Sequence, residues 1–169
     1  MDDAAMMLLR HAELPDLDAL LDVQRAGAQR GLGHIFPQDT HPFPRDTILA
    51  RWVAEIADPG VEVYVIEHAG RISGFAATRG DELLHFGTAV PTWGTGLAAA
   101  AHDEILARLA ATGVTRAHLR VFEENHRAIR FYEKLGWQRT EARTRTSFPP
   151  HPVLIGYERR LAATPGGMS

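Results

Sequence analysis

Three strand-like segments follow one another in the middle of the chain, with two-residue breaks between them. The segments are Val61 to His68, Arg71 to Arg79 and Glu82 to Val90, and the breaks are Ala69-Gly70 and Gly80-Asp81. Two-residue breaks that contain glycine are typical of hairpin turns, which join antiparallel strands. The middle of the chain therefore predicts an antiparallel sheet of three strands, and the remaining segments must pack around it.

Helix-like and strand-like segments flank this central sheet. Apolar residues at helical spacing predict helices over 14–31, 45–57, 97–112 and 125–135. Further strands are expected at 6–10, 115–122, 137–147 and 153–160. The resulting order, β-α-α-β-β-β-α-β-α-β-β, fits an α/β fold (a mixed α+β sheet) with helices on both faces. We expect a single domain over residues 1–161 and a disordered tail over 162–169.

The apolar face of each helix predicts part of the core. The residues expected to be buried are Leu17, Leu20 and Leu21 in the first helix, Ile48, Leu49, Trp52, Val53 and Ile56 in the second, and Leu97, Ala101, Ile105 and Leu109 in the third.

The composition excludes several classes of chemistry. The chain has no cysteine, a single lysine at Lys134 and no serine in a G-x-S-x-G context, which argues against thiol, Schiff-base and serine nucleophiles. Its nine histidines form no H-E-x-x-H or similar cluster, so no metal is expected. A net charge of −3 gives no positive field for nucleic acid or an anionic membrane, and the acidic start does not resemble a signal peptide. We therefore expect a cytoplasmic protein with no nucleic-acid or membrane partner.

The third central strand runs into a glycine-containing segment, Trp93-Gly94-Thr95-Gly96-Leu97-Ala98, and from there directly into a helix. The first N–H groups of a helix are unpaired and lie at the positive end of its dipole, so they can bind a phosphate. A strand-to-helix turn that merely needs glycine explains the same residues equally well. Neither a P-loop nor a G-x-G-x-x-G dinucleotide motif is present.

A second segment, Leu119 to Trp137, reads as a strand followed by a helix that starts at an asparagine. It matches the pattern N-x-x-A-x-x-F-Y-x-x-x-G-[FW] at Asn125, Ala128, Phe131, Tyr132, Gly136 and Trp137. Together with the glycine segment and the order of elements, it means that the chain resembles the GNAT superfamily of N-acetyltransferases over nearly its whole length.

The resemblance implies that acetyl-CoA binds as cosubstrate in a cleft where the strands at 82–90 and 115–122 separate. The family's pyrophosphate loop, Q/R-x-x-G-x-G/A, falls on Trp93, Gly96 and Ala98, with Trp93 in place of the usual polar residue. The implied cofactor-binding residues are Phe86, Gly87 and Thr88 beside the acetyl group and pantetheine, the loop Trp93, Gly94, Thr95, Gly96, Leu97 and Ala98 at the pyrophosphate, and Asn125 at the pantetheine.

The resemblance also implies the catalytic residues. Tyr132 would protonate the leaving thiolate, and Glu82 falls where the family often has a glutamate or histidine that acts as the base or orders a water. A base is needed because an amine that is mostly protonated at pH 7 cannot attack a thioester. His85 is the alternative base, and in a regular strand it would point away from Glu82. A turn acid at Glu82, a core tyrosine at Tyr132 and a helix cap at Asn125 are the structural alternatives.

These features predict an acetyl-CoA-dependent N-acetyltransferase that moves the acetyl group directly to a primary amine. The expected acceptor pocket, His34 to Pro44 and Phe148 to Pro152, fits a small molecule or a peptide N-terminus equally well. A non-catalytic acyl-CoA-binding or sensing domain is the main alternative, and an ATP-binding regulatory module is another. Transfer of a longer acyl group and assembly as a homodimer stay open.

Overall fold

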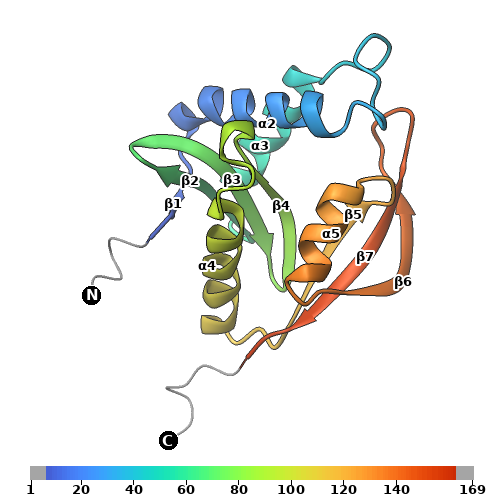
Figure 1. Cartoon of the computed structure of the whole chain (residues 1–169). Helices are drawn as coiled ribbons and strands as arrows, with labels where there is room; N and C mark the ends of the chain where they lie inside the picture. Colours follow the sequence, from blue (N-terminus) through green and yellow to red (C-terminus); the bar gives the residue numbers. More distant parts are fainter. Residues whose placement is uncertain (1–6, 163–169) are drawn as a thin grey trace, which may run out of the picture.

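The computed structural model describes residues 7–162, in which seven strands form one twisted sheet (Figure 1). The spatial order is β1-β2-β3-β4-β5-β7-β6, and every neighbouring pair is antiparallel except β4 and β5, which are parallel. The strands are β1 Leu9–His11, β2 Val61–His68, β3 Arg71–Arg79, β4 Glu82–Thr88, β5 Arg116–Phe122, β6 Gln138–Arg145 and β7 Val153–Arg160. The fold class and the order of elements expected from the sequence are confirmed. The start of the first expected strand and all but Ala162 of the expected tail lie outside the described residues.

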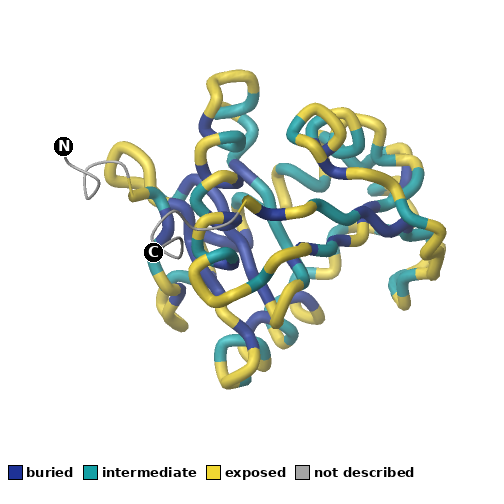
Figure 2. The backbone as a smooth tube through the Cα atoms, turned by 90° about the horizontal axis from the view of Figure 1, so that it is seen from below, coloured by how far each residue is buried: buried dark blue, intermediate teal, exposed yellow. Residues whose placement is uncertain are grey.

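Helices cover both faces of this sheet. The main helices are α2 Leu17–Gly31, α3 Arg45–Ala57, α4 Leu97–Ala111 and α5 His126–Lys134, and the short 3-10 turns are η1 Leu14–Asp16 and η2 Val90–Thr92. One core layer joins α2 and α3 to the sheet, and a second joins α4 and α5 to its other face. Figure 2 shows that the buried backbone is concentrated in the central strands between these two layers.

The helix faces predicted to be buried are largely observed. Leu17, Leu20 and Leu21 of α2 are buried, as are all four residues expected in α4. Val53 of α3 is an exception, because it is 42% exposed while Trp52 is fully buried. Adjacent helical residues lie about 100° apart, since a turn holds 3.6 residues, and the inward stripe of α3 follows Ile48 and Trp52.

Two irregularities of β4 shape the centre of the molecule. The strand pairs with β5 only at Glu82–His118 and Leu83–Leu119, beyond which the two strands separate. On its other side, β3 residues 77 and 78 face His85 and Leu83, so that Leu84 is the extra residue of a β-bulge. The strand ends at Thr88 rather than Val90, because the segment that follows contains Pro91, which cannot donate to a ladder, and forms η2.

Within residues 7–162, no helix has both the length and the apolar character that a membrane span requires.

Candidate active site

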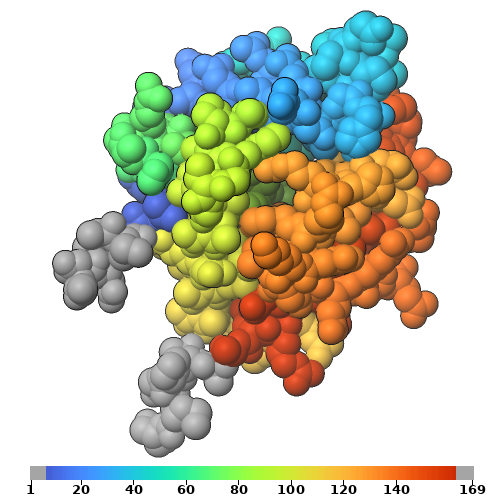
Figure 3. Space-filling view, viewed as in Figure 1, coloured from blue at the N-terminus to red at the C-terminus, as the bar shows by residue number. Residues whose placement is uncertain are grey.

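A cavity of about 940 Å³ opens where β4 and β5 separate. Its wall is built from α2, α3, β4, β5 and α5, together with the α2–α3 loop and the β6–β7 loop. The space-filling view is hollowed where the blue, yellow-green and orange segments of the chain meet (Figure 3). Nearly every sequence region that we expected to form a site therefore contributes to this cavity.

The end of β4 forms one side of the cavity, as the resemblance implied. Phe86, Gly87 and Thr88 all line it. Gly87 has no room for a side chain, since a Cβ there would lie 2.5 Å from Cζ of Phe75. The ring of Phe86 stacks on Phe131 of α5, with 6.0 Å between ring centroids, and so links β4 to α5 behind the cavity.

Trp93 connects the glycine segment to the elements around it. Its indole Nε1 donates to the backbone oxygen of Thr88 at 2.9 Å, and the guanidinium of Arg127 lies 3.5 Å from its ring centroid. Trp93 and Arg127 line the cavity. From the sequence, Arg127 was considered as a contact to the nucleotide phosphates but was not selected, because an arginine on a helix surface is usually solvated.

The rest of the glycine segment, Gly94 to Ala98, lies outside the cavity wall. Gly94 and Gly96 adopt φ values of +81° and +93°, a region in which other residues are strained, and Gly96 caps α4. The first backbone hydrogen bond of α4 runs from Ala100 N to Gly96 O, and the N–H groups of Ala98 and Ala99 donate to no atom of residues 7–162. The α4 N-terminus thus offers free donors, and phosphate binding there stays a prediction.

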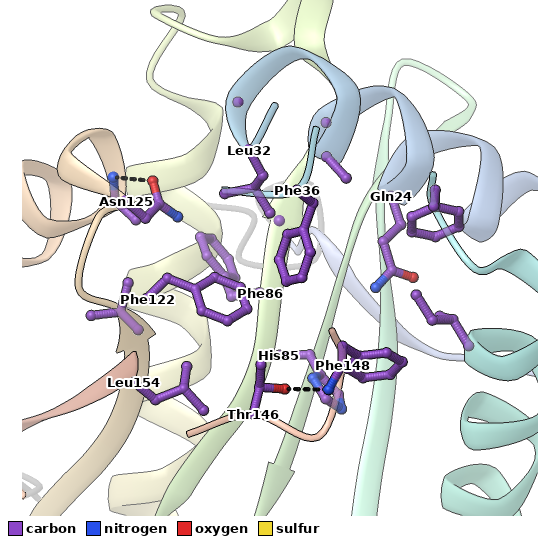
Figure 4. Close-up of a pocket in the computed structure, with 18 of the residues that line it drawn as sticks. Gln24, Leu32, Phe36, His85, Phe86, Phe122, Asn125, Thr146, Phe148 and Leu154 are labelled. Atoms are coloured by element: carbon purple, nitrogen blue, oxygen red, sulfur yellow. Dashed lines mark hydrogen bonds between the residues drawn. The ribbon is translucent and has the colours of Figure 1, made fainter. Parts of the chain in front are cut away.

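Asn125 is the N-cap of α5, and its Oδ1 accepts from the backbone N–H of Ala128 at 3.2 Å (Figure 4). The cap interpretation of this residue is therefore confirmed. Asn125 also lines the cavity, and its amide nitrogen donates to no described residue. One side chain can cap the helix through its oxygen and keep its N–H groups for a ligand.

Tyr132 belongs both to the core and to the cavity wall. It is 8% exposed, and its ring lies edge-on to Phe131 and Trp137. Its hydroxyl has no hydrogen-bond partner among the described residues. Burial raises the pKa of Tyr132 above its ordinary value, so the hydroxyl keeps its proton at neutral pH.

Glu82 and His85 lie on the same face of β4, toward α3. The expectation that they point in opposite directions was wrong, because the bulge at Leu84 breaks the alternation of the strand. Both residues line the cavity. Glu82 accepts from Nε of Arg120 at 3.2 Å, at the end where β4 and β5 are still paired.

His85 contacts α3. Its Nε2 lies 3.0 Å from Oε1 of Glu55, and its ring lies edge-on to Trp52, with 4.9 Å between centroids. Burial alone would raise the pKa of Glu55, but the hydrogen bond to His85 and the charges of His85 and Arg51 lower it below its ordinary value. Within residues 7–162, no three histidine, aspartate or glutamate side chains gather closely enough to hold a metal ion.

Two further residues of α3, Arg51 and Glu55, were missed by the sequence analysis. Arg51 lines the cavity, and its Nε is buried without a hydrogen-bond partner. Both residues lie within one turn of the buried Trp52. The periodicity of α3 alone does not distinguish them from ordinary solvent-exposed charged residues. Only their contacts with β4 and the cavity reveal them.

The expected acceptor segments close the outer side of the cavity. Phe36 of the α2–α3 loop lies edge-on to Phe122 of β5, at 5.4 Å between centroids, and Phe148 of the β6–β7 loop also lines the cavity (Figure 4). His34 does not line it, and its Nε2 instead lies 2.7 Å from the backbone oxygen of Glu124. The α2–α3 loop is therefore attached to the connection between β5 and α5.

Residues 27–137 match the sequence model of the acetyltransferase (GNAT) family. Uncharacterized N-acetyltransferases of Mycobacterium bovis and Mycobacterium tuberculosis are 38% identical over 100 residues, which is 56% of this chain and 64% of each relative. The match thus spans less than two thirds of the length of these curated relatives.

Solved structures with the same fold include two acetyltransferases. A GCN5-related N-acetyltransferase from Rhodopseudomonas palustris is 16% identical, with a TM-score of 0.76 over 90% of this chain and 94% of its own. The PaiA N-acetyltransferase from Thermoplasma acidophilum, in complex with coenzyme A, is 15% identical, with a TM-score of 0.69 over 90% of this chain and 97% of its own. The match to the family model, which covers well over half of the residues, and the shared fold show that this chain belongs to the acetyltransferase (GNAT) family.

Proposed function

We propose that this protein is an acetyl-CoA-dependent N-acetyltransferase that transfers the acetyl group directly to a primary amine. The observation that carries the proposal is the cavity between β4 and β5, which brings the β4 backbone, Tyr132 and the His85–Glu55 pair to one space. The complex of the Thermoplasma protein with coenzyme A supports the same ligand for this chain.

The proposed cofactor site runs along β4 to the start of α4. Phe86, Gly87 and Thr88 would lie beside the acetyl group and pantetheine, and the Nδ2 of Asn125 would donate to the pantetheine from the opposite side. The free N–H groups at the start of α4, with the loop from Trp93 to Ala98, would hold the pyrophosphate.

In the proposed reaction, a base takes a proton from the ammonium group of the acceptor. The neutral nitrogen then attacks the thioester carbonyl carbon, the new C–N bond forms, and the nitrogen releases its second proton to solvent. The C–S bond breaks as the departing thiolate takes a proton from Tyr132, which regains a proton from solvent. Direct transfer of this kind needs no covalent enzyme intermediate, in agreement with a chain that lacks cysteine.

We favour His85 over Glu82 as the base. His85 neighbours Phe86 and lies where β4 has separated from β5, and Glu55 can stabilise the imidazolium that forms. Glu82 is already engaged as the acceptor of a hydrogen bond from Arg120, at the end where β4 is still paired with β5. The assignment of Glu82 as the base or as a residue that orders a water stays a prediction. The pH profiles of Glu82→Gln and His85→Gln distinguish it from the assignment of His85.

Acetyl-CoA binding is the first test. A ligand that binds only the native state stabilises it by RT ln(1 + [L]/Kd), about 2.7 kcal/mol at a hundredfold excess over Kd, so acetyl-CoA should raise the Tm. No shift near millimolar acetyl-CoA would refute the proposal. A shift with ATP but not with coenzyme A would favour a nucleotide-binding module, and acetyl-CoA binding without thiol release for any amine would favour an acyl-CoA-binding domain.

A further inference from the structure

Arg51 is a cation in the cavity wall whose guanidinium has no hydrogen-bond or ion-pair partner among residues 7–162. It forms no hydrogen bond or ion pair within 4.0 Å to any of residues 7–162, and its Nε is shielded from solvent. The nearby Glu55 directs its carboxylate to Nε2 of His85 instead. A partly buried guanidinium is costly unless an anion or another acceptor binds its remaining N–H groups.

Two of the other three arginines of the cavity wall donate to acceptors of the protein. Arg120 donates to Glu82, Arg145 donates to the backbone oxygen of His151, and Arg127 lies over the ring of Trp93. Arg51 and Arg127 thus lie over aromatic rings without a described acceptor, and of the two only Arg51 belongs to α3, the helix whose Glu55 contacts His85.

We propose that the acceptor amine carries a carboxylate and that Arg51 binds this carboxylate while the amine lies at His85. The inference rests on the proposed N-acetyltransferase function and names the substrate class of the same site. A guanidinium is suited to this task because its planar N–H groups match the two oxygens of a carboxylate.

The geometry of α3 restricts the distance between the two groups. Arg51 and Glu55 are four residues apart, so they lie on successive turns of one face, about 5–6 Å from each other along the axis. Because Glu55 contacts His85, Arg51 and the imidazole of His85 lie at neighbouring turns of α3, so that one small acceptor can contact both. Free amino acids are the smallest acceptors that carry both an amine and a carboxylate.

The remaining wall agrees with an anionic acceptor that has an apolar body. The described wall holds four arginines and one glutamate, and that glutamate is paired, which disfavours a polycationic amine. Phe148 lies 5.6 Å below the guanidinium of Arg51, and Phe36 and Phe122 provide further apolar surface. The ring of Phe148 covers one face of the guanidinium, so an anion would bind at its N–H edge.

Matched acceptor pairs test this inference. We would first measure acetyl-CoA binding by calorimetry, and then thiol release with L-amino acids, their uncharged α-amides, ethanolamine, phosphoethanolamine, a polyamine and a peptide with a neutral N-terminal residue. Wild type should use free amino acids with a kcat/KM about 10- to 100-fold above that of the amides, the range expected for a charge-assisted hydrogen bond. The N-acetyl amino acids should also raise the Tm more than their amides, which gives an equilibrium measurement independent of turnover.

Arg51→Gln should abolish this preference by raising KM for amino acids about 10- to 100-fold while KM for the amides stays nearly constant. Arg51→Lys keeps the positive charge but lacks the planar guanidinium, so it should retain part of the preference for amino acids over amides. Arg45→Gln is the matched control, because Arg45 lies on the same helix, outside the cavity wall, and pairs with the exposed Asp18.

Several outcomes would overturn the inference while the proposed function stands. One is faster acetylation of the amides, the polyamine or the peptide than of amino acids. Another is an equal loss of kcat/KM for an amino acid and its amide in Arg51→Gln. A third is a protein that binds acetyl-CoA but whose Tm rises equally with N-acetyl amino acids and with their amides. A preference for phosphoethanolamine over amino acids would assign Arg51 to a phosphate and also reject the carboxylate. Absence of acetyl-CoA binding would reject both proposals.

Discussion

The Nε2 atom of His85 lies 3.0 Å from one carboxylate oxygen of Glu55 and 3.1 Å from the other, across 30 residues of sequence. Both side chains are mostly buried, with 18% of His85 and 14% of Glu55 exposed, yet His85 reaches the cavity. A carboxylate in this position fixes the direction of the imidazole. We infer that Glu55 is a positioning residue for His85.

This relationship predicts distinct pH profiles for two variants, His85→Gln and Glu82→Gln. In wild type, kcat/KM should rise with pH as the base loses its proton, and this limb should vanish in His85→Gln and persist in Glu82→Gln. The kcat of His85→Gln should fall about 10²- to 10⁴-fold. A limb that vanishes in Glu82→Gln and persists in His85→Gln would assign the base to Glu82.

For the positioning role of Glu55, we expect Glu55→Gln to lower kcat at least about tenfold while the Kd for acetyl-CoA stays unchanged. The amide keeps the volume of the side chain but removes its negative charge. Asp58→Asn provides a control, because Asp58 is an exposed carboxylate beyond the end of the same helix that pairs with Arg79. If Glu55 only contributed to stability, its variant would lower the Tm and leave kcat intact.

Tyr132→Phe should lower kcat about 10²- to 10⁴-fold with little change in acetyl-CoA affinity or Tm. The hydroxyl makes no hydrogen bond to the described residues, so its removal leaves no partner unsatisfied. The measurement is single-turnover acetyl transfer, which isolates the chemical step. An unchanged rate would leave Tyr132 as a core residue only.

Two substitutions of Asn125 separate its cap from its proposed ligand contact. Asn125→Ser keeps an N-cap acceptor, whereas Asn125→Ala should destabilise the fold by about 1 kcal/mol. Both remove the amide N–H groups, so both should weaken acetyl-CoA binding to a similar degree. Urea unfolding measures the free energy of unfolding, and calorimetry measures the Kd for acetyl-CoA. If acetyl-CoA binding weakened only in the destabilised Asn125→Ala and not in Asn125→Ser, the ligand contact would be contradicted.

His102 predicts a loss of stability in mild acid. It is 1% exposed, its Nε2 accepts from the indole N–H of Trp137 at 2.9 Å, and burial lowers its pKa in the folded state. The unfolded chain therefore binds a proton at His102 at a higher pH than the folded chain does. The contribution of neutral, buried His102 to the free energy of unfolding is full above about pH 6.5 and is lost as the pH falls below that value. The slope is at most about 1.4 kcal/mol per pH unit.

Urea unfolding between pH 8 and pH 5 measures this slope, and His102→Gln should reduce it. Asp16, Glu55 and Glu123, whose pKa values are lowered in the fold, lose their contributions only in more acidic solution, below about pH 4.5. A slope between pH 8 and pH 5 that is the same in His102→Gln and wild type would contradict the assignment.

The sequence by itself determined the elements with strong local signals. The bounds of α3, β2, β3 and β7 agree with the expectation because periodicity, hairpin glycines and prolines act within a few residues. The local sequence predicted a strand followed by a helix capped at Asn125, and the resemblance carried by this motif implied that Asn125 and Tyr132 lie at the cleft, where both line the cavity.

Only the tertiary structure decided which way the catalytic candidates face and what they contact. The bulge at Leu84 arises from the pairing of β4 with β3, so a reading of β4 alone predicted regular alternation and put His85 on the wrong side. The contact of Glu55 with His85 and the unpaired position of Arg51 depend on how α3 packs on the sheet. Such contacts join residues far apart in the chain, and their energies depend on burial and charge, which no local pattern in the sequence records.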